Sequence, residues 1–318
     1  MADEPETQSA SEVVNLPEAD QQRCGFIAII GAPNAGKSTL VNALVGTKVT
    51  IVCHKVQTTR MPVRGIAIEG DSQLVFIDTP GIFSPRRRLD RAMVESAWTG
   101  AADGDVVALI VDAAKGIDDN VSRILQKLKG ERGRFVLLLN KVDKVQDKEQ
   151  LLKLTQELTS EVSFERVFMI SALNANGVQD FKAYLAEVVP IGPWHYPEED
   201  VSDIPMRVLA AEITRERIFH LLHEELPYSI SVETTDWKQL RNGSVRVEQT
   251  IFVERESQKR IVLGKGGKAI KQVSSESRQE LREILETDVH LFLFVKVREG
   301  WGDDPERYRE LGLSFPKD

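Results

Sequence analysis

GAPNAGKSTL, residues 31–40, follows the short apolar run FIAII. Gly31, Gly36, Lys37 and Ser38 satisfy the pattern G-x-x-x-x-G-K-[ST], in which a glycine-rich turn cradles phosphates with its backbone N–H groups. Lys37 can reach the β- and γ-phosphates, the Ser38 hydroxyl can bind Mg²⁺, and a helix expected from about this point directs its positive end at the same site. An ordinary glycine-rich turn is the alternative interpretation, but the strand pattern before it and the helix pattern after it favour a phosphate-binding loop.

The composition predicts a globular protein of two domains, with 318 residues and 42% hydrophobic content. Cys24 and Cys53 are too few for a disulfide framework and have no metal-binding spacing, which favours a reducing compartment. No apolar run approaches the roughly 20 residues that span a bilayer, and the acidic N-terminus lacks the features of a signal peptide. We therefore expect a cytoplasmic protein.

The net charge of −8 is distributed unevenly. Residues 1–22 contain six acidic residues and no lysine or arginine, so only −2 remains for the rest of the chain. This stretch is also poor in large apolar side chains, and we expect a disordered acidic tail. The negative total does not exclude a nucleic-acid partner, because basic residues are clustered elsewhere.

Short, continuous apolar runs alternate with helical patterns in the first half of the chain. Such runs are typical of strands that are covered on both faces. The alternation predicts an α/β fold, a doubly wound, mostly parallel sheet, with one further strand at an edge over residues 65–70. The expected covered strands are residues 26–30, 74–78, 106–112, 135–140 and 167–171, and the expected helices are 37–46, 86–102, 118–130, 147–161 and 177–189.

A stretch rich in proline, PIGPWHYPEED, begins at residue 190 and predicts a linker. Beyond it the pattern changes to helix, two strands, two helices and a strand, which is a smaller α/β unit. We expect four segments: a disordered tail (1–22), a nucleotide-binding domain (23–189), a linker (190–204), and a second domain with its C-terminal tail (205–318).

Two further motifs follow the phosphate loop. DTPG begins at Asp78, at the end of an expected strand, where an acid can hold a Mg²⁺-bound water and the Gly81 N–H can meet a γ-phosphate. HKVQTTRMP (54–62) lies between the two motifs and can supply a threonine to the metal. Thr59 is the first choice for this metal ligand and Thr58 is the second. The alternative interpretation is a solvated polar loop without a functional role.

NKVD starts at Asn140, where another expected strand ends. A carboxylate at Asp143 can accept two hydrogen bonds from the paired N1–H and N2–H₂ donors of guanine, which adenine lacks. Asn140 would tie this loop to the phosphate loop and the Lys141 stem would cover the base, whereas a plain helix-capping loop is the alternative. A backbone N–H in the SAL sequence could meet the guanine O6, with Ser171, Ala172 and Leu173 as the candidates.

The second half contains RESQKRIVLGKGGKAIKQ, residues 255–272, with six basic residues and one acid. A G-x-x-G turn between two helices in an αββααβ order is typical of a type II KH domain, where it contacts a nucleic-acid backbone of about four nucleotides. A solvated turn is the alternative. Trp301 and Phe315 could stack on bases or fix the C-terminus to its own domain. The RNA-binding candidates are Arg255, Lys259, Arg260, Gly264, Lys265, Gly266, Gly267, Lys268 and Lys271.

The motifs of the first half, in this order and spacing, resemble those of the translation-factor-related GTPases. Asn34 and QTTR (57–60) make the chain similar to their Era branch. The resemblance implies GTP hydrolysis with Mg²⁺ and switch loops near residues 48–62 and 79–100. The implied metal ligands are Ser38, Thr59 and, through water, Asp78, and the transition state would be supported by Lys37, Thr59 and Gly81. The implied GTP-binding residues are Gly31, Asn34, Ala35, Gly36, Lys37, Ser38, Thr39, Asp78, Gly81, Asn140, Lys141, Asp143, Ser171, Ala172 and Leu173.

Hydrolysis is expected to be slow without help. Ile82 follows Gly81, where small signalling GTPases have a glutamine that orients the attacking water. In related GTPases with an asparagine at the position of Asn34, a bound K⁺ supplies missing positive charge, and the resemblance implies K⁺ as a second cofactor beside Mg²⁺.

A GTPase domain, a proline-rich linker and a KH domain together extend the resemblance over about residues 23 to 304. It implies a monomeric GTP switch, stimulated by RNA, that binds the 3′ end of 16S ribosomal RNA and assists assembly of the 30S subunit. It also implies a peripheral contact with the inner membrane, for which the sequence gives no physical reason. Two alternatives stay open: a regulatory GTPase that docks on a protein or membrane surface, and an RNA-binding module with a structural nucleotide.

Overall fold

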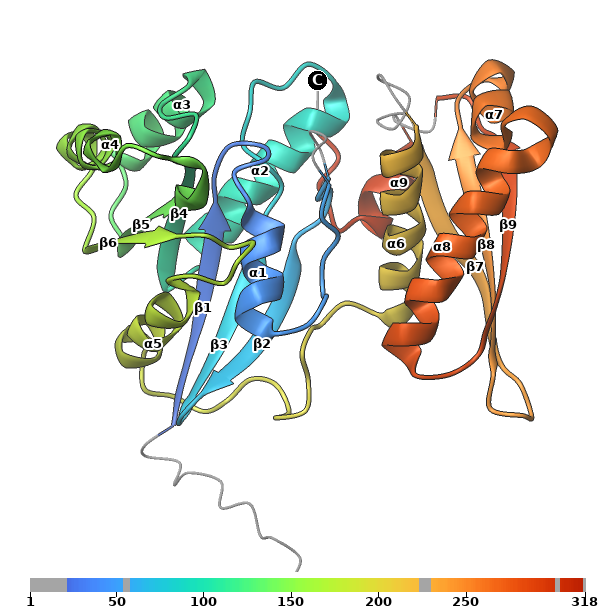
Figure 1. Ribbon diagram of the computed structural model, residues 1–318, viewed down its shortest axis with the longest axis horizontal. Coiled ribbons are helices and arrows are strands. Elements are labelled where there is room, and N and C mark those ends of the chain that lie inside the picture. The colour runs from blue at the N-terminus through green and yellow to red at the C-terminus, as the bar shows by residue number, and fades with distance from the viewer. Residues whose placement is uncertain (1–21, 54–57, 223–229, 301–303, 317–318) are drawn as a thin grey trace, which may run out of the picture.

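The computed structural model describes residues 22–53, 58–222, 230–300 and 304–316, and the expected acidic tail lies outside this part almost entirely. Its larger sheet has the strand order β2-β3-β1-β4-β5-β6 (Figure 1). Neighbouring strands are parallel except for β2, which pairs antiparallel with β3 at the edge. The mostly parallel sheet with an added edge strand is therefore confirmed. The strands are β1 (Arg23–Ile30), β2 (Val63–Glu69), β3 (Ser72–Asp78), β4 (Val106–Asp112), β5 (Phe135–Asn140) and β6 (Arg166–Ile170).

Helices cover both faces of this sheet, which explains why its strands are continuously apolar. Helices α1 and α5 pack on one face with Leu40, Val41 and Phe181, all without exposed surface. The other face is covered by α2, α3 and α4. The helices are α1 (Lys37–Val45), α2 (Arg88–Ala102), α3 (Asp119–Leu128), α4 (Lys148–Glu161) and α5 (Val178–Val188), with a 3₁₀ turn η1 (Val142–Lys144).

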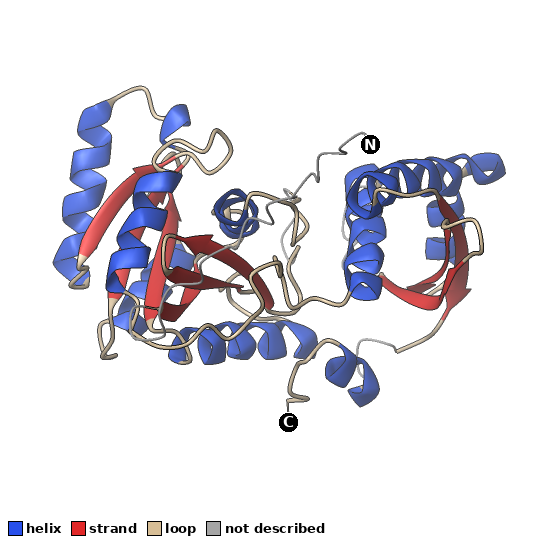
Figure 2. Ribbon diagram, turned by 90° about the horizontal axis from the view of Figure 1, so that it is seen from below, coloured by secondary structure: helices blue, strands red, loops and turns tan. Residues whose placement is uncertain are grey.

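The second unit is a three-stranded sheet, β7-β8-β9, with helices on the face nearer to the first unit (Figure 2). Strand β8 pairs antiparallel with β7 and parallel with β9. The element order α6, β7, β8, α7, α8, β9 is the expected αββααβ. Its elements are α6 (Met206–Leu221), β7 (Ser231–Gln239), β8 (Val245–Val253), α7 (Glu256–Leu263), the 3₁₀ turn η3 (Lys265–Gly267), α8 (Lys268–Leu285) and β9 (Val289–Val297).

The chain between the two units follows the edge strand β2. The Ile66 N–H donates to the Val201 carbonyl at 2.9 Å, and the Asp203 N–H donates to the Arg64 carbonyl at 3.3 Å. An ion pair of 2.8 Å joins the Arg64 guanidinium to the Asp203 carboxylate. These contacts cover part of the edge that β2 would otherwise expose.

The C-terminal segment returns to the first unit (Figure 1). It contains helix α9 (Pro305–Glu310), and Tyr308 and Leu313 are buried against Leu89 and Met93 of α2. Phe315 joins this cluster and lies beneath the Arg88 guanidinium, 5.0 Å from the ring centre. The expectation that Phe315 fixes the C-terminus to its own domain is therefore wrong, and Trp301 lies outside the described residues.

Within the described part of the chain, no helix combines the length and apolar character needed to cross a membrane.

Candidate functional site

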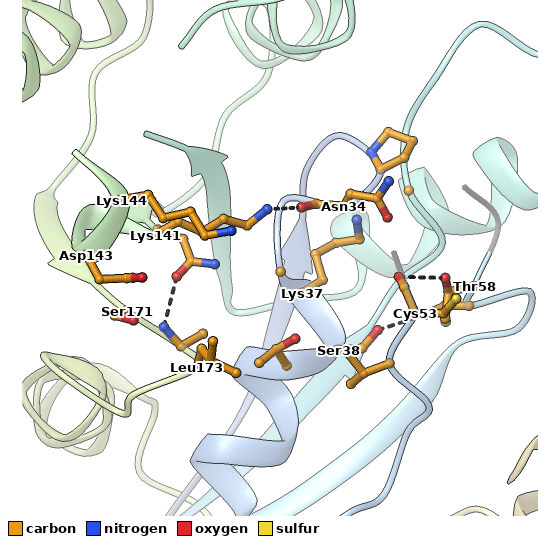
Figure 3. Close-up of a pocket in the computed structure, with 18 residues that line it drawn as sticks. Asn34, Lys37, Ser38, Cys53, Thr58, Lys141, Asp143, Lys144, Ser171 and Leu173 are labelled. Carbon is orange, nitrogen blue, oxygen red and sulfur yellow. Dashed lines mark hydrogen bonds between the residues drawn. The ribbon is translucent and has the colours of Figure 1, made fainter. Parts of the chain in front are cut away.

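A pocket of about 290 Å³ opens at the carboxyl ends of the parallel strands, where the predicted nucleotide motifs meet (Figure 3). The loop between β1 and α1 forms its floor. Gly36 has φ 107°, and a Cβ at this position would lie 2.2 Å from the Asn140 amide nitrogen, so only glycine fits. The lining residues are Pro33, Asn34, Gly36, Lys37, Ser38, Thr39, Val52, Cys53, Thr58, Thr59, Gly81, Asn140, Lys141, Asp143, Lys144, Ser171, Ala172 and Leu173.

Lys37 is the buried cation of this pocket, with 6% of its surface exposed. Its ammonium donates to the carbonyls of Gly31 at 3.2 Å and Ala32 at 3.0 Å. Burial, opposed by Asp78, lowers the pKa of Lys37 to about 8. A phosphate group in the loop would restore the preference for the charged ammonium.

Four oxygen groups converge beside Lys37 at the end of β3. The Asp78 Oδ2 accepts from Ser38 at 2.8 Å, Thr50 at 2.9 Å and Thr59 at 3.2 Å. The Ser38 and Thr59 hydroxyls also lie 3.0 Å apart. Thr58 instead donates to the Cys53 carbonyl, so the geometry places Thr59, the first choice, at this cluster.

The donor set fits a hard divalent cation. The Asp78 Oδ1 is buried and has no hydrogen-bond partner among the described residues. Burial raises the pKa of Asp78 against the lowering effect of the hydroxyl donors, because the carboxylate is removed from water. A nearby cation would stabilise the ionised form, and oxygen ligands of this kind are those that Mg²⁺ prefers.

The loop after β3 approaches the phosphate loop closely. A Cβ on Gly81 would lie 3.0 Å from Pro33, and the Ile82 N–H donates to the Gly31 carbonyl at 3.0 Å. The Ile82 side chain is 4% exposed and points into the core on the α2 face of the sheet. It is therefore turned away from the site and cannot orient a water molecule there.

Asn140 links three loops. Its amide donates to the Ala35 carbonyl at 2.8 Å, and its Oδ1 accepts from the Ala172 N–H at 2.9 Å. Lys141, with φ 64°, donates to the carbonyl of Asn34 at 2.6 Å. These contacts brace the phosphate loop against the loops that follow β5 and β6.

Asp143 and the residues after β6 line the side of the pocket opposite Ser38 and Thr58 (Figure 3). Asp143 is exposed, so its carboxylate can meet a ligand. The Ser171 N–H donates to the Asn176 carbonyl, and the Ala172 N–H is already engaged by Asn140. Leu173 is 77% exposed, and its N–H has no hydrogen-bond partner among the described residues, so among the three SAL candidates it has the available donor.

The GKGG turn lies between α7 and α8, in the second unit. Gly264, Gly266 and Gly267 have φ of 71°, 62° and 75°. Gly266 and Gly267 have the left-handed conformation, although the G-x-x-G pattern itself does not require a glycine at position 266. Five of the six predicted cations are exposed around the turn and Lys259 is partly exposed: Arg255, Lys259, Arg260, Lys265, Lys268 and Lys271.

Comparison with known proteins identifies both units of the fold. A family model described as a 50S ribosome-binding GTPase matches residues 26–141, and one described as a KH domain matches residues 225–302. The chain is 62% identical to GTPase Era of Brucella suis over 299 residues, which is 94% of this chain and 96% of that protein. The chain belongs to the Era family of GTPases. It is also 62% identical to GTPase Era of Rhizobium meliloti, with 93% of this chain and 94% of that protein covered.

Solved Era structures share the whole architecture. A crystal structure of Era in complex with MgGDPNP and nucleotides 1506–1542 of 16S ribosomal RNA has a TM-score of 0.86 at 36% identity, covering 92% of this chain and 99% of that one. A variant of Aquifex aeolicus Era bound to GDP.AlF4− has a TM-score of 0.87 over the same shares. As an Era-family member the chain is a GTPase, and its two units are a GTPase fold and a KH domain.

The sequence prediction missed several residues of this Era-family protein, among them Thr50 at the Asp78 carboxylate, Asp112 and Ile261. Asp112 ends β4 and accepts from the Lys141 ammonium at 2.7 Å, so it holds the lysine beside Asn34. An acid at the end of a buried strand, the same signal that identified Asp78, could have revealed it. Ile261 is 53% exposed on α7, just before the GKGG turn, where apolar surface can contact bases.

Proposed function

We propose that the chain is a GTP-controlled switch that binds the 3′ region of 16S ribosomal RNA and assists assembly of the 30S subunit. One observation carries the proposal: the nucleotide pocket and the cation-flanked GKGG turn occur in the architecture that Era has in complex with MgGDPNP and 16S ribosomal RNA. The segments proposed for these roles are a GTPase domain over residues 23–189, a linker over 190–204 and a KH domain with its tail over 205–318.

In this proposal the pocket distinguishes guanine and phosphate through separate residues. The exposed Asp143 carboxylate would accept from guanine and the Leu173 N–H would donate to its O6, which is supported by the position of both residues in the pocket lining. Lys37 and the loop amides bind the phosphates, and the Gly81 N–H meets the γ-phosphate. Among the remaining predicted contacts, Gly31, Ala35 and Ser171 belong to the same loops, and Thr39 lies in the first turn of α1.

Ser38 and Thr59 would hold Mg²⁺ directly and Asp78 would hold it through water. The orphaned Asp78 Oδ1 and the adjoining hydroxyls support this assignment. When bound, Mg²⁺ supplies positive charge to the β- and γ-phosphate oxygens. For K⁺, the supporting observation is Asn34, which lines the pocket in a left-handed conformation with φ 62°. GTP turnover in potassium chloride against sodium chloride tests this second cation, and equal rates would contradict it.

The RNA-binding role can be tested at the GKGG turn. Replacing Lys265 and Gly266 by aspartate places two negative charges where phosphates should approach. The matched control, Lys265→Gln with Gly266→Asn, has the same substituted positions without the negative charge, and asparagine accepts the left-handed conformation of residue 266. We expect the aspartate pair to abolish binding of labelled single-stranded RNA of the 16S 3′ sequence, and with it any stimulation of GTP hydrolysis, while GDP affinity is unchanged.

A salt titration adds an independent readout. If about three phosphates are neutralised, log affinity should fall with log salt with a slope of roughly −2 for single-stranded RNA. RNA binding that survives in the aspartate pair would contradict the role of the GKGG turn in RNA binding. Absence of RNA binding by the wild type would instead favour docking on a protein or membrane surface. Equal RNA affinity with GDP and GTP would contradict the switch and leave the nucleotide a structural role.

A further inference from the structure

Thr59 lies at the Ser38 and Asp78 side chains although the 48–62 segment around it contains no helix or strand among its described residues. Within the GTPase domain, the Asn42 Oδ1 accepts from the N–H groups of Val49 at 2.9 Å and Thr50 at 3.1 Å. These bonds fix the start of the segment, about ten residues before Thr59. Other contacts must hold its second half.

The residues on both sides of Thr59 are bonded to the second domain. The Arg60 Nη1 donates to the Ile230 carbonyl at 2.7 Å, and the Arg215 guanidinium of α6 donates to the Thr58 carbonyl. Both guanidinium groups also lie near the Phe219 ring, at 6.0 Å for Arg60 and 4.9 Å for Arg215. The backbone that presents Thr59 is therefore fixed from outside its own domain.

Glu216 of α6 adds a third contact. Its Oε1 accepts from the Val52 N–H at 2.7 Å and its Oε2 accepts from the Lys48 ammonium at 2.5 Å. Lys48 also donates to Glu280 of α8. Glu216 is 3% exposed and Arg60 and Arg215 are each 2% exposed. Removing one member of such a buried polar set leaves its partners uncompensated, so these contacts strongly favour one backbone position.

We propose that Glu216 and Arg60 are positioning residues for GTP hydrolysis, which hold Thr59 at the Ser38–Asp78 site through the second domain. The inference rests on the proposed metal role of Thr59. It follows that loss of these contacts should lower the rate of the chemical step and weaken the response to Mg²⁺. Guanine and diphosphate recognition should persist, because Asp143 and Lys37 lie on other loops.

Glu216→Ala tests the inference directly, with Glu283→Ala as the matched control. Glu283 is an exposed carboxylate on α8 that accepts from Gln279 of the same helix. In Glu216→Ala we expect kcat to fall about tenfold, equivalent to about 1.4 kcal/mol in activation free energy. Half-maximal turnover should need more Mg²⁺, whereas KM and GDP affinity should stay within about twofold. Glu283→Ala should match the wild type in all four measurements.

Combination with Thr59→Ala separates positioning from general destabilisation. If Glu216 acts through Thr59, the variant with both Glu216→Ala and Thr59→Ala should have a kcat within about twofold of that of Thr59→Ala alone. Glu216→Gln guards against misfolding, since the amide can still accept from Val52 but cannot pair with the Lys48 charge. It should give an intermediate rate.

Three outcomes would overturn the inference. An unchanged kcat in Glu216→Ala, where Thr59→Ala is impaired, would refute positioning but leave the metal role of Thr59 intact. If Glu216→Ala lowered kcat by the same factor in the wild type and in Thr59→Ala, its effect would be structural and independent of Thr59. If Thr59→Ala itself kept normal turnover and Mg²⁺ response, the proposed metal role would be wrong, and the inference would fall with it.

Discussion

Lys37 shows how far the site could be predicted one residue at a time. The motif predicted a lysine that reaches bound phosphates, and in the structure the Lys37 ammonium donates to the Gly31 and Ala32 carbonyls of the phosphate loop. The near-complete burial of Lys37 could not be predicted, because it depends on how the loops after β3 and β5 pack against the phosphate loop. The same is true of Leu173: the sequence offered three candidate donors, and the bonds made by Asn140 and Asn176 decide which is available.

The lowered pKa of Lys37 predicts that nucleotide binding takes up protons. The pKa is about 8 in the free protein, so at about pH 8 roughly half of the sites hold a neutral amine. Phosphates favour the ammonium, so GDP binding should take up about half a proton there and weaken as the pH rises further. Calorimetric titrations with GDP in two buffers of different ionisation enthalpy measure this uptake.

Lys37→Arg is the control for this measurement, because a guanidinium stays charged throughout the range. Its residual GDP binding should show no such uptake. Equal heats for the wild type in both buffers at about pH 8 would contradict the assignment.

Asp143 predicts base specificity. Asp143→Asn replaces an acceptor by a mixed donor and acceptor group, and a hydrogen bond to a charged group contributes roughly 1.5–3 kcal/mol. GTP binding should weaken at least tenfold, and XTP should become the preferred nucleotide because xanthine has an oxygen where guanine has its amino group. Competition between the two nucleotides measures this, and wild-type GTP affinity in the variant would rule Asp143 out.

The elements were predicted well, and their contacts were not. Alternating apolar runs and helical patterns located nearly every helix and strand, since both periodicities are local properties of the sequence. The edge strand and the αββααβ order followed in the same way. No local pattern shows that α6 and α8 hold the 48–62 segment, because Lys48, Glu216 and Glu280 are far apart in sequence.

Glu280 of α8 predicts an acid-sensitive contact between the domains. Burial alone would raise its pKa, but hydrogen bonds from Lys48 and Arg217 outweigh this effect and lower it. A carboxylate whose pKa is lowered by folding stabilises the folded protein at a pH above its unfolded-state pKa, which is near 4.5 for Glu280. This stabilisation is lost as the pH falls through the lower pKa of the folded state. Glu280→Gln should therefore cost about 1 kcal/mol near neutral pH.

The cost should shrink as the pH falls below about 4.5 and then through the lower pKa of the folded carboxyl, because protonation removes the charge that Lys48 and Arg217 contact. Urea unfolding of both proteins across this range measures the difference. A difference that stays constant with pH would show that the Glu280 charge has no part in the contact.

At the scale of the whole molecule, the described residues join the two domains through two separate contacts. One is the polar set around the 48–62 segment, and the other is the apolar packing of the C-terminal segment on α2. The second contact could not be predicted, because the tail has few apolar residues and its partner on α2 lies about 220 residues earlier in the sequence. A resemblance to a family shows which domains are present more readily than how they touch.

Leu313→Ala tests the second contact. Leu313 is 5% exposed. Truncation of a buried leucine to alanine typically lowers the free energy of unfolding by roughly 2–5 kcal/mol. The loss should be at the lower end, because the tail can detach before the domain unfolds. Leu152→Ala on α4, where the leucine is 65% exposed, is the matched control. Urea unfolding and binding of a hydrophobic dye should distinguish the two variants, and equal behaviour would contradict the packing of the tail on α2.

The packing of Tyr308 and Leu313 on α2 also has a consequence for how the chain is made. Translation completes α2 first and supplies the tail only after the entire KH domain has been synthesised. During that interval Leu89, Ala92 and Met93 face water on an otherwise folded nascent domain, a state in which apolar surface invites chaperones or wrong partners. Tyr308 and Leu313, which cover these three residues, are synthesised after the second domain, so only a molecule that contains both domains covers this part of α2.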